Sequence, residues 1–348
     1  MIRTGDKNLI TDVPGIQIGN THDEKLRSGV TVIKPDHPAV AAIDVRGGGP
    51  GTRETEVLGA DCLVDYIHAI VLSGGSAFGL DAAGGVMSFL AERKIGFELE
   101  GAIIPIVPSA ILFDLLNGGN KKWGKYNPYR EMGYEAAENL SDHFELGNSG
   151  AGFGAVAGSL KGGLGSASLV YTDVSEEITV GAIAAVNPMG SVTMPDSPVM
   201  WASAYERENE LGGQPLPEKS GNMELDYQFR LPVGKNTTIV TVATDAILTK
   251  PQARRVAMMA QDGLARAIRP IHSPFDGDSV FVMSTGKRNL SDPAAGLAKL
   301  GMFAADCVTR AIARGVFEAE GIGGFESYRS RYGRYLSTNL GGSNDSSE

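Results

Sequence analysis

The sequence predicts a layered α/β fold, with strands in the middle and helices outside, and two patterns support this prediction. The first is a series of short runs that are almost continuously apolar, as expected for strands covered on both faces. The second is a set of stretches with apolar residues at helical spacing that lie between and after these runs. The chain has 348 residues, 42% hydrophobic and 21% charged, which is normal for a globular protein and compatible with one large domain over residues 1–348.

The expected strands are rich in Val, Ile, Ala and Thr. They are Gly29–Lys34, Ala39–Val45, His68–Ser73, Ile103–Val107, Leu164–Tyr171, Thr179–Val186, Thr238–Thr244 and Ser279–Ser284. The expected helices are Leu80–Glu92, Glu131–Leu140, Pro251–Ile268 and Pro293–Glu318. Pro251 stands at the first turn of its helix, where proline is tolerated, and Ser291 and Asp292 precede the last helix as capping residues.

Two segments lack such periodicity. Residues 189–235 are polar, with scattered Pro, Gly and Glu, and we expect a mobile linker between two strands. Residues 341–348, which are Gly, Ser, Asn, Asp and Glu only, are expected to be a disordered tail.

Charge and residue counts exclude several classes of function. The net charge is −10, which argues against binding to nucleic acid, since that needs a basic face. The five histidines do not cluster and the two cysteines, Cys62 and Cys307, lie far apart, so no metal or other cofactor is expected. The N-terminus lacks an apolar signal region and no apolar run reaches about 18 residues, so we expect a cytoplasmic protein that does not associate with membranes.

A small polar turn, Gly234–Asn236, leads directly into a strand that starts with Thr237. Thr237 could be an ordinary residue at the start of a strand. If the bond between Asn236 and Thr237 is cut, however, Thr237 carries a hydroxyl nucleophile and a free α-amine that can act as its base.

Residues Gly74–Phe78 nearly fit the nucleophile-elbow pattern G-x-S-x-G, but Phe78 stands in place of the last glycine. Ser76 is therefore a weaker candidate nucleophile than Thr237. The glycines favour a tight strand-to-helix turn, whose backbone N–H groups, including that of Gly75, could face a ligand.

Four other residues have both an ordinary and a functional interpretation. Lys161 lies among glycines just before an apolar strand, and Asn187 follows another strand as a turn residue or as an amide donor for an oxyanion. Asp276 and Asp278 flank Gly277 before a strand, either as a simple turn or as two carboxylates that bind an α-ammonium group and hold protons.

Taken together, the sequence resembles the DmpA-type aminopeptidases (L-aminopeptidase/D-Ala-esterase/amidase) and, within them, the nylon-hydrolase branch. The resemblance covers roughly residues 10 to 310. The matching stretches are Asp12–Gly19, Asp44–Glu54, Leu72–Ala82, Val107–Asp114, Lys161–Ser166, Ala185–Pro188, Val242–Ala246 and Asp276–Asp278.

The resemblance implies a self-cleaving N-terminal-nucleophile hydrolase with a four-layer αββα sandwich. It implies cleavage into residues 1–236 and 237–348, tetramers of cleaved protomers, and active-site positions at Lys161, Asn187, Asp276 and Asp278. One departure is Phe78, where many members of the family have tyrosine, so an oxyanion would depend more on Asn187 and on backbone N–H groups.

We therefore expect an amide hydrolase that acts on short peptides or on aminoalkanoate (polyamide) oligomers through an acyl-enzyme on Thr237. Alternatives are an exo-acting aminopeptidase, an acyltransferase similar to the ornithine acetyltransferases, and, least favoured, an uncleaved binding protein.

Overall fold

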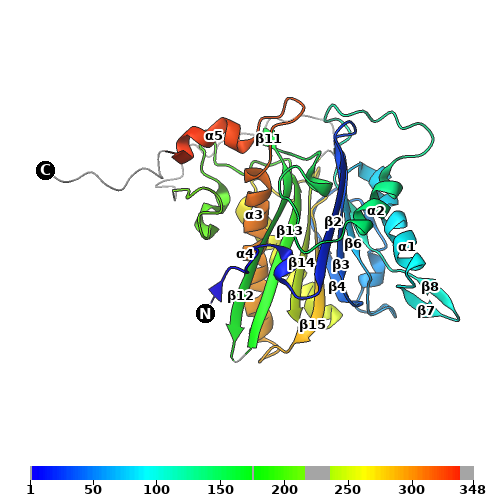
Figure 1. Cartoon of the computed structure of the whole chain (residues 1–348). Coiled ribbons are helices and arrows are strands. Elements are labelled where there is room, and N and C mark those ends of the chain that lie inside the picture. The colour runs from blue at the N-terminus through cyan, green and yellow to red at the C-terminus, as the bar shows by residue number, and fades with distance from the viewer. Residues whose placement is uncertain (1, 175, 216–235, 338–348) are drawn as a thin grey trace.

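The computed structural model describes residues 2–174, 176–215 and 236–337, and these form four layers (Figure 1). Helices α3 (Lys250–Ala267) and α4 (Ala295–Phe317) cover one sheet, and helices α1 (Ala82–Glu92) and α2 (Tyr129–Glu138) cover the other. The two sheets face each other in the middle. The expected αββα sandwich is thereby confirmed.

The first sheet has six strands in the order β1-β12-β13-β14-β15-β4. Their bounds are β1 Ile2–Arg3, β12 Gly163–Asp173, β13 Glu176–Asn187, β14 Thr237–Ala246, β15 Ser279–Arg288 and β4 Val40–Val45. Only β14 and β15 run parallel; the other neighbours are antiparallel. All ten residues of β14 are buried, which explains its nearly continuous apolar and threonine sequence.

The second sheet has five strands in the order β2-β3-β6-β9-β5. Their bounds are β2 Ile16–Asp23, β3 Ser28–Pro35, β6 Ile70–Ser73, β9 Ser109–Ile111 and β5 Thr52–Arg53. Two separate hairpins complete the strands: β7 Phe97–Leu99 with β8 Ala102–Ile104, and β10 Val156–Ala157 with β11 Leu160–Lys161.

Three apolar clusters hold the four layers together. The middle cluster fills the space between the sheets, with Ile18 and Leu72 from one sheet facing Ile239 and Phe281 from the other. The outer clusters join each sheet to its own pair of helices. Buried apolar area of this extent supplies most of the driving force for folding.

The eight strands and four helices expected from the sequence all correspond to observed elements, with one clear difference in extent. The expected strand Ile103–Val107 is limited to β8, which ends at Ile104 in an exposed hairpin. Pro105 follows directly, and proline has no N–H to continue a ladder. The sequence also gave no indication of β2, of β9 or of helix α5 (Tyr328–Ser337).

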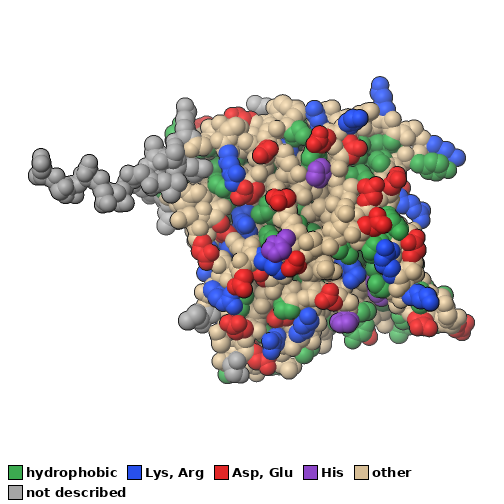
Figure 2. Space-filling model, in the orientation of Figure 1, with side chains coloured by type: hydrophobic (Ala, Val, Ile, Leu, Met, Phe, Trp, Pro, Cys, Tyr) green, Lys and Arg blue, Asp and Glu red, His purple; other side chains and the backbone are tan. Residues whose placement is uncertain are grey.

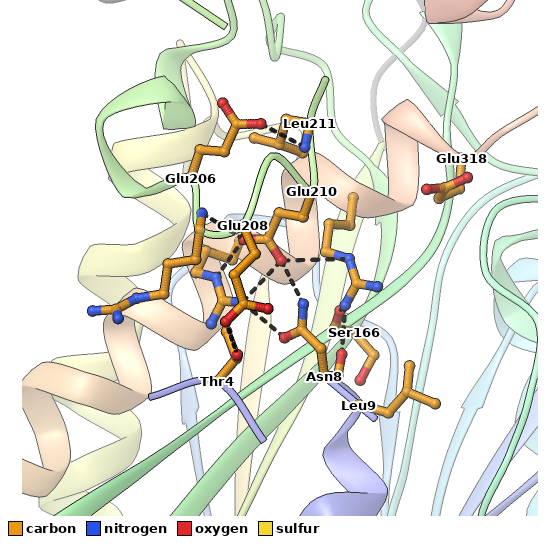
Figure 3. A network of polar contacts seen from close by, with 12 residues as sticks. Thr4, Asn8, Leu9, Ser166, Glu206, Glu208, Glu210, Leu211 and Glu318 are labelled. Carbon is orange, nitrogen blue, oxygen red and sulfur yellow. Dashed lines mark hydrogen bonds and ion pairs between the residues drawn. The ribbon is translucent and has the colours of Figure 1, made fainter. Parts of the chain in front are cut away.

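The structure differs from the expected mobile linker over residues 189–215. This part contains a 3-10 helix, Trp201–Tyr205, and buries Met200 and Leu211 completely. Glu210 fixes it further, because its carboxylate pairs with Arg310 of α4 and accepts a hydrogen bond from Asn8 (Figure 3). The rest of the expected linker, residues 216–235, and the expected tail, residues 341–348, lie outside the described residues.

Acidic and basic side chains are interspersed over the face of the molecule in Figure 2, without a continuous area of one sign. Within the part of the chain that the structure describes, no helix has the length and apolar character needed to cross a membrane.

Candidate active site

Thr237 is the first residue of β14, and only 3% of its surface is exposed. It lies directly opposite Asn187, the last residue of β13, in the antiparallel register of the two strands. The candidate nucleophile and the candidate amide donor are therefore brought together by strand pairing, although they lie 50 positions apart in the sequence.

The Thr237 hydroxyl lies beside the peptide carbonyl that precedes it. In the continuous chain, Oγ of Thr237 donates a hydrogen bond to the carbonyl oxygen of Asn236. The N–H of Gly277 donates to that same carbonyl oxygen at 3.1 Å and lies 3.2 Å from Thr237 Oγ. A Cβ atom at position 277 would lie 2.8 Å from Thr237 Oγ, so this close approach requires glycine.

The two aspartates lie on the loop beside Thr237 and are fully buried. Asp278 Oδ1 accepts the N–H of Thr238 at 2.8 Å, and Asp276 Oδ1 accepts the N–H of Met189 at 3.1 Å. Burial, with the neighbouring charge of Asp278 as a second cause, raises the pKa of Asp276 to about 6. A pKa in this region is suited to a group that takes part in proton transfer.

Each aspartate is also held by a residue that the sequence analysis did not single out. Ser273 donates its hydroxyl hydrogen to Asp276 Oδ2, and His272 contacts Asp278 Oδ2 with its backbone N–H and with Nδ1, both at 3.0 Å. Both residues belong to the stretch between Arg269 and Asp278, so proximity in sequence was the one available signal. Their pairing depends on the conformation of the loop, which no simple pattern specifies.

The glycine-rich segment Arg46–Gly49 fixes this loop from the other side. Its backbone N–H groups donate to the carbonyl oxygens of Ser273, Asp276 and Asp278. A Cβ atom at Gly47 would lie 2.3 Å from the backbone of both aspartates, so the two segments pack backbone against backbone. This packing explains the run of glycines that follows Arg46 in the sequence.

Lys161 is fully buried in the hairpin of β10 and β11, and its Nζ donates to the carbonyl oxygens of Gly162 and Gly152. Burial lowers its pKa to about 7, although the carboxylate of Asp114 acts in the opposite direction. Lys161 is connected to Thr237 through Asn187. Asn187 Oδ1 accepts the N–H of Val156, which pairs with Lys161 in the hairpin, and Asn187 itself pairs with Thr237.

The turn at Gly74–Phe78 follows β6, and the segment Leu112–Asp114 connects it to the other site residues. Ser76 N–H donates to Leu112, Gly75 N–H donates to Asp114 Oδ1, and the amide of Asn187 donates to the carbonyl of Phe113. The N–H groups of Gly75 and Ser76 thus bind protein oxygens and do not face a ligand, contrary to the expectation, and Ser76 is connected to Thr237 only through these segments.

Phe78, on the outer side of this turn, is 49% exposed and lies edge-on to Trp123 with ring centroids 5.2 Å apart. The two rings form an apolar surface at the outer side of the turn.

The arrangement combines a buried hydroxyl, a carbonyl group within its reach, a backbone N–H on that carbonyl oxygen, and nearby groups that titrate between about 6 and 7. This combination is suited to acyl transfer to a hydroxyl. Among the described residues, no cluster of His, Cys, Asp or Glu side chains is arranged to hold a metal ion.

The sequence is similar to a known protein family and to several of its members. The family model of peptidase family S58 matches residues 8–330. An uncharacterized aminopeptidase of Mycobacterium tuberculosis is 39% identical over 347 residues, which cover 93% of this chain and 98% of the relative. A 6-aminohexanoate-oligomer endohydrolase of Kocuria sp. is 29% identical over 301 residues, which cover 82% of this chain and 78% of the relative.

Among solved structures, the chain is similar to the L-aminopeptidase D-Ala-esterase/amidase of Ochrobactrum anthropi, described as a variant of the Ntn hydrolase fold. The TM-score is 0.72 at 20% identity, and the match covers 97% of this chain and 96% of the other.

Proposed function

The chain belongs to peptidase family S58 and is an amide-bond hydrolase, and we propose that it is of the N-terminal-nucleophile type and activates itself by cutting the bond between Asn236 and Thr237. The observation that carries this proposal is the contact of Thr237 Oγ with the carbonyl group of Asn236, whose oxygen also accepts the N–H of Gly277.

In the self-cleavage step, Thr237 Oγ attacks the carbonyl carbon of Asn236 and releases its proton to a base. The N–H of Gly277 stabilises the negative charge that develops on the carbonyl oxygen. The C–N bond then breaks, the nitrogen of Thr237 takes a proton, and an ester joins Asn236 to Thr237 Oγ. Water hydrolyses this ester, which leaves a carboxylate on Asn236 and a free α-amine on Thr237.

In the mature enzyme, the α-amine of Thr237 accepts the proton of its own hydroxyl. The unperturbed pKa of such an amine is about 7.7–8.0, which suits a base at neutral pH. Oγ attacks the substrate amide, the protonated amine gives its proton to the leaving nitrogen, and water hydrolyses the acyl-enzyme. Asp276, Asp278 and Lys161 set the charge around the amine, and Asn187, opposite Thr237, is the proposed side-chain donor to the oxyanion.

We propose short peptides and aminoalkanoate oligomers as substrates. The relatives named aminopeptidase and 6-aminohexanoate-oligomer endohydrolase support these two classes. The apolar surface of Phe78 and Trp123 suits the methylene groups or side chains of such compounds. A dipeptide amide and a soluble polyamide oligomer, assayed side by side, distinguish exo-acting from endo-acting hydrolysis. Cytoplasmic location and assembly into tetramers stay predictions, and light scattering tests the second.

The first experiment is intact mass spectrometry of the denatured protein with N-terminal sequencing. We expect two fragments, residues 1–236 and 237–348, with Thr237 at the new N-terminus. Thr237→Ala should stay a single chain of 36.6 kDa without activity, whereas Thr237→Ser, which keeps a hydroxyl, should still cleave. Cleavage of the alanine variant at this bond would overturn the proposal.

A further inference from the structure

We propose that His272 is a positioning residue for Thr237, acting through the carboxylate of Asp278. The inference rests on the proposed function, since it concerns the same hydroxyl. It begins with the partners of Asp278, whose side chain is completely buried. A buried carboxylate is stable only when its oxygens accept hydrogen bonds or face a positive charge, so these partners determine how the carboxylate is oriented.

The two carboxylate oxygens of Asp278 have different hydrogen-bond partners. Oδ1 accepts the N–H of Thr238, which belongs to the peptide group that directly follows Thr237. Oδ2 contacts the backbone N–H and Nδ1 of His272. Because a carboxylate only accepts hydrogen bonds, this contact assigns the imidazole proton to Nδ1 of His272, which then donates to Asp278. The contact of the imidazole with Oδ2 thus sets the orientation of the carboxylate. In that orientation Oδ1 accepts the N–H of Thr238, next to the nucleophile.

The backbone of His272 supports a role for its side chain. Its φ is +56°, in the left-handed region that glycine adopts most readily and in which asparagine, aspartate and histidine are enriched among the other residues. A residue keeps such a conformation when its contacts with the surrounding structure favour it. Here the left-handed conformation lets both the backbone N–H and the ring of one residue reach the same oxygen.

The side chain of His272 is less buried than the other groups of the site. Its side chain is 20% exposed, whereas those of Asp278 and Lys161 are fully buried. His272 lies at the outer side of the site and does not contact Thr237 through any hydrogen bond that the structure shows. We therefore expect it to act on the rate through geometry and not as the base.

Three variants separate the side chain from the backbone. His272→Asn keeps a donor, because an asparagine amide nitrogen can take the place of Nδ1, and it tolerates a positive φ. His272→Gly removes the free-energy cost of the positive φ, but it also removes the side-chain donor to Asp278. His272→Ala removes the donor and keeps the backbone cost. His37→Gly, at an exposed position, is the matched control.

The measurement is the rate of cleavage of freshly folded precursor, followed by kcat and KM of the mature enzyme. We expect His272→Gly and His272→Ala to lower the cleavage rate and kcat by about 10- to 100-fold with KM nearly unchanged, because the hydroxyl is misplaced and substrate contacts are not. His272→Asn should restore most of the rate. Circular dichroism and thermal melting identify any variant that fails to fold.

The inference is overturned if His272→Gly cleaves at the rate of the unchanged protein, or if folded His272→Asn is as slow as His272→Gly. Failure of the proposed function is distinguishable, because the unchanged protein would then stay intact in all preparations.

Discussion

Glu210 and Asp276 are both buried carboxylates, yet Glu210 lies against two arginines and Asp276 lies beside a second carboxylate. Figure 3 shows the first of these surroundings, where Glu210 faces α4 and Asn8. Its partners, Arg310 above all, keep the pKa of Glu210 below its ordinary value in spite of burial. Burial and the neighbouring Asp278 instead raise the pKa of Asp276 to about 6.

Glu210 and Arg310 form a first cluster of charged residues, and Asp276, Asp278 and Lys161 form a second. The difference in pKa direction indicates the role of each. Paired opposite charges hold one protonation state and fix the segment around residues 206–211 to α4 and to the N-terminal segment. Among the described residues, neither Asp276 nor Lys161 lies so close to an opposite charge, and burial moves their pKa values toward neutrality. Groups with pKa values near the working pH are suited to proton transfer. We therefore propose that the first cluster serves stability and the second serves chemistry, and substitutions in both clusters test this proposal.

The largest expected effect is that of Lys161→Met on the second cluster. We expect cleavage and hydrolysis to slow by about 10²- to 10⁴-fold, the range for loss of an acid–base group. In the unchanged protein, the cleavage rate should rise between pH 6 and 8, since Asp276 ionises near 6 and Lys161 becomes neutral above about 7. The measurement is the pH profile of cleavage by gel densitometry.

Lys250→Met is the matched control for Lys161. Lys250 is also buried, and its ammonium donates to the carbonyl oxygens of Val57, Gly59 and Cys62. Its loss should lower the melting temperature and leave the cleavage rate unchanged. Equal slowing by the two variants would mean that Lys161 has a structural role only.

The next effect concerns the first cluster. Glu210→Ala leaves Arg310, which is 1% exposed, without its buried partner, and the free energy of unfolding should fall by about 3–5 kcal/mol. Urea denaturation in the Thr237→Ala background measures this change on one continuous chain. The double variant Glu210→Leu with Arg310→Met should recover much of the loss. A lower cleavage rate for a folded Glu210→Ala protein would contradict the assignment.

The smallest effect is that of Asp276→Asn on stability. Because the pKa is raised in the folded state, the protonated carboxyl group of Asp276 contributes stability that is fully present below about pH 3.8 and is lost as the pH rises through 6. The neutral amide avoids the loss, so the free energy of unfolding at pH 8 should rise by about 1–3 kcal/mol. The gain should vanish near pH 4. A variant that is less stable at pH 8 would show that the hydrogen bonds of Asp276 outweigh the charge effect.

Much of the fold was predictable because its strands and helices have strong periodic patterns. β14 and α3 are examples: the first is a continuous buried run, and the second begins at a capping box formed by Thr249 and Gln252. β2 was missed because Ile16 and Ile18 alternate with polar residues over too short a length, and β9 because it has three residues only.

The site was predictable in its residue types but not in its contacts. The resemblance pointed to Thr237, Asn187 and the two aspartates, and the structure brings these four together. The register that pairs Asn187 with Thr237 depends on how two distant strands align, which a single sequence does not specify. The contacts of His272 and Ser273 depend on backbone angles within one loop, and these follow from tertiary packing against Arg46–Gly49.

The order of strands in the six-stranded sheet has a further consequence for how the protein refolds after cleavage. The proposed cut assigns β14 and β15 to one fragment, and their neighbours on either side, β13 and β4, to the other. Each fragment alone would leave strand edges unpaired, which invites aggregation. The uncut chain refolds in a unimolecular reaction, whereas the cut protein must bring two polypeptides together. Its recovery after denaturation should therefore depend on protein concentration, and we expect the uncut chain to regain the native state more readily than the cut protein.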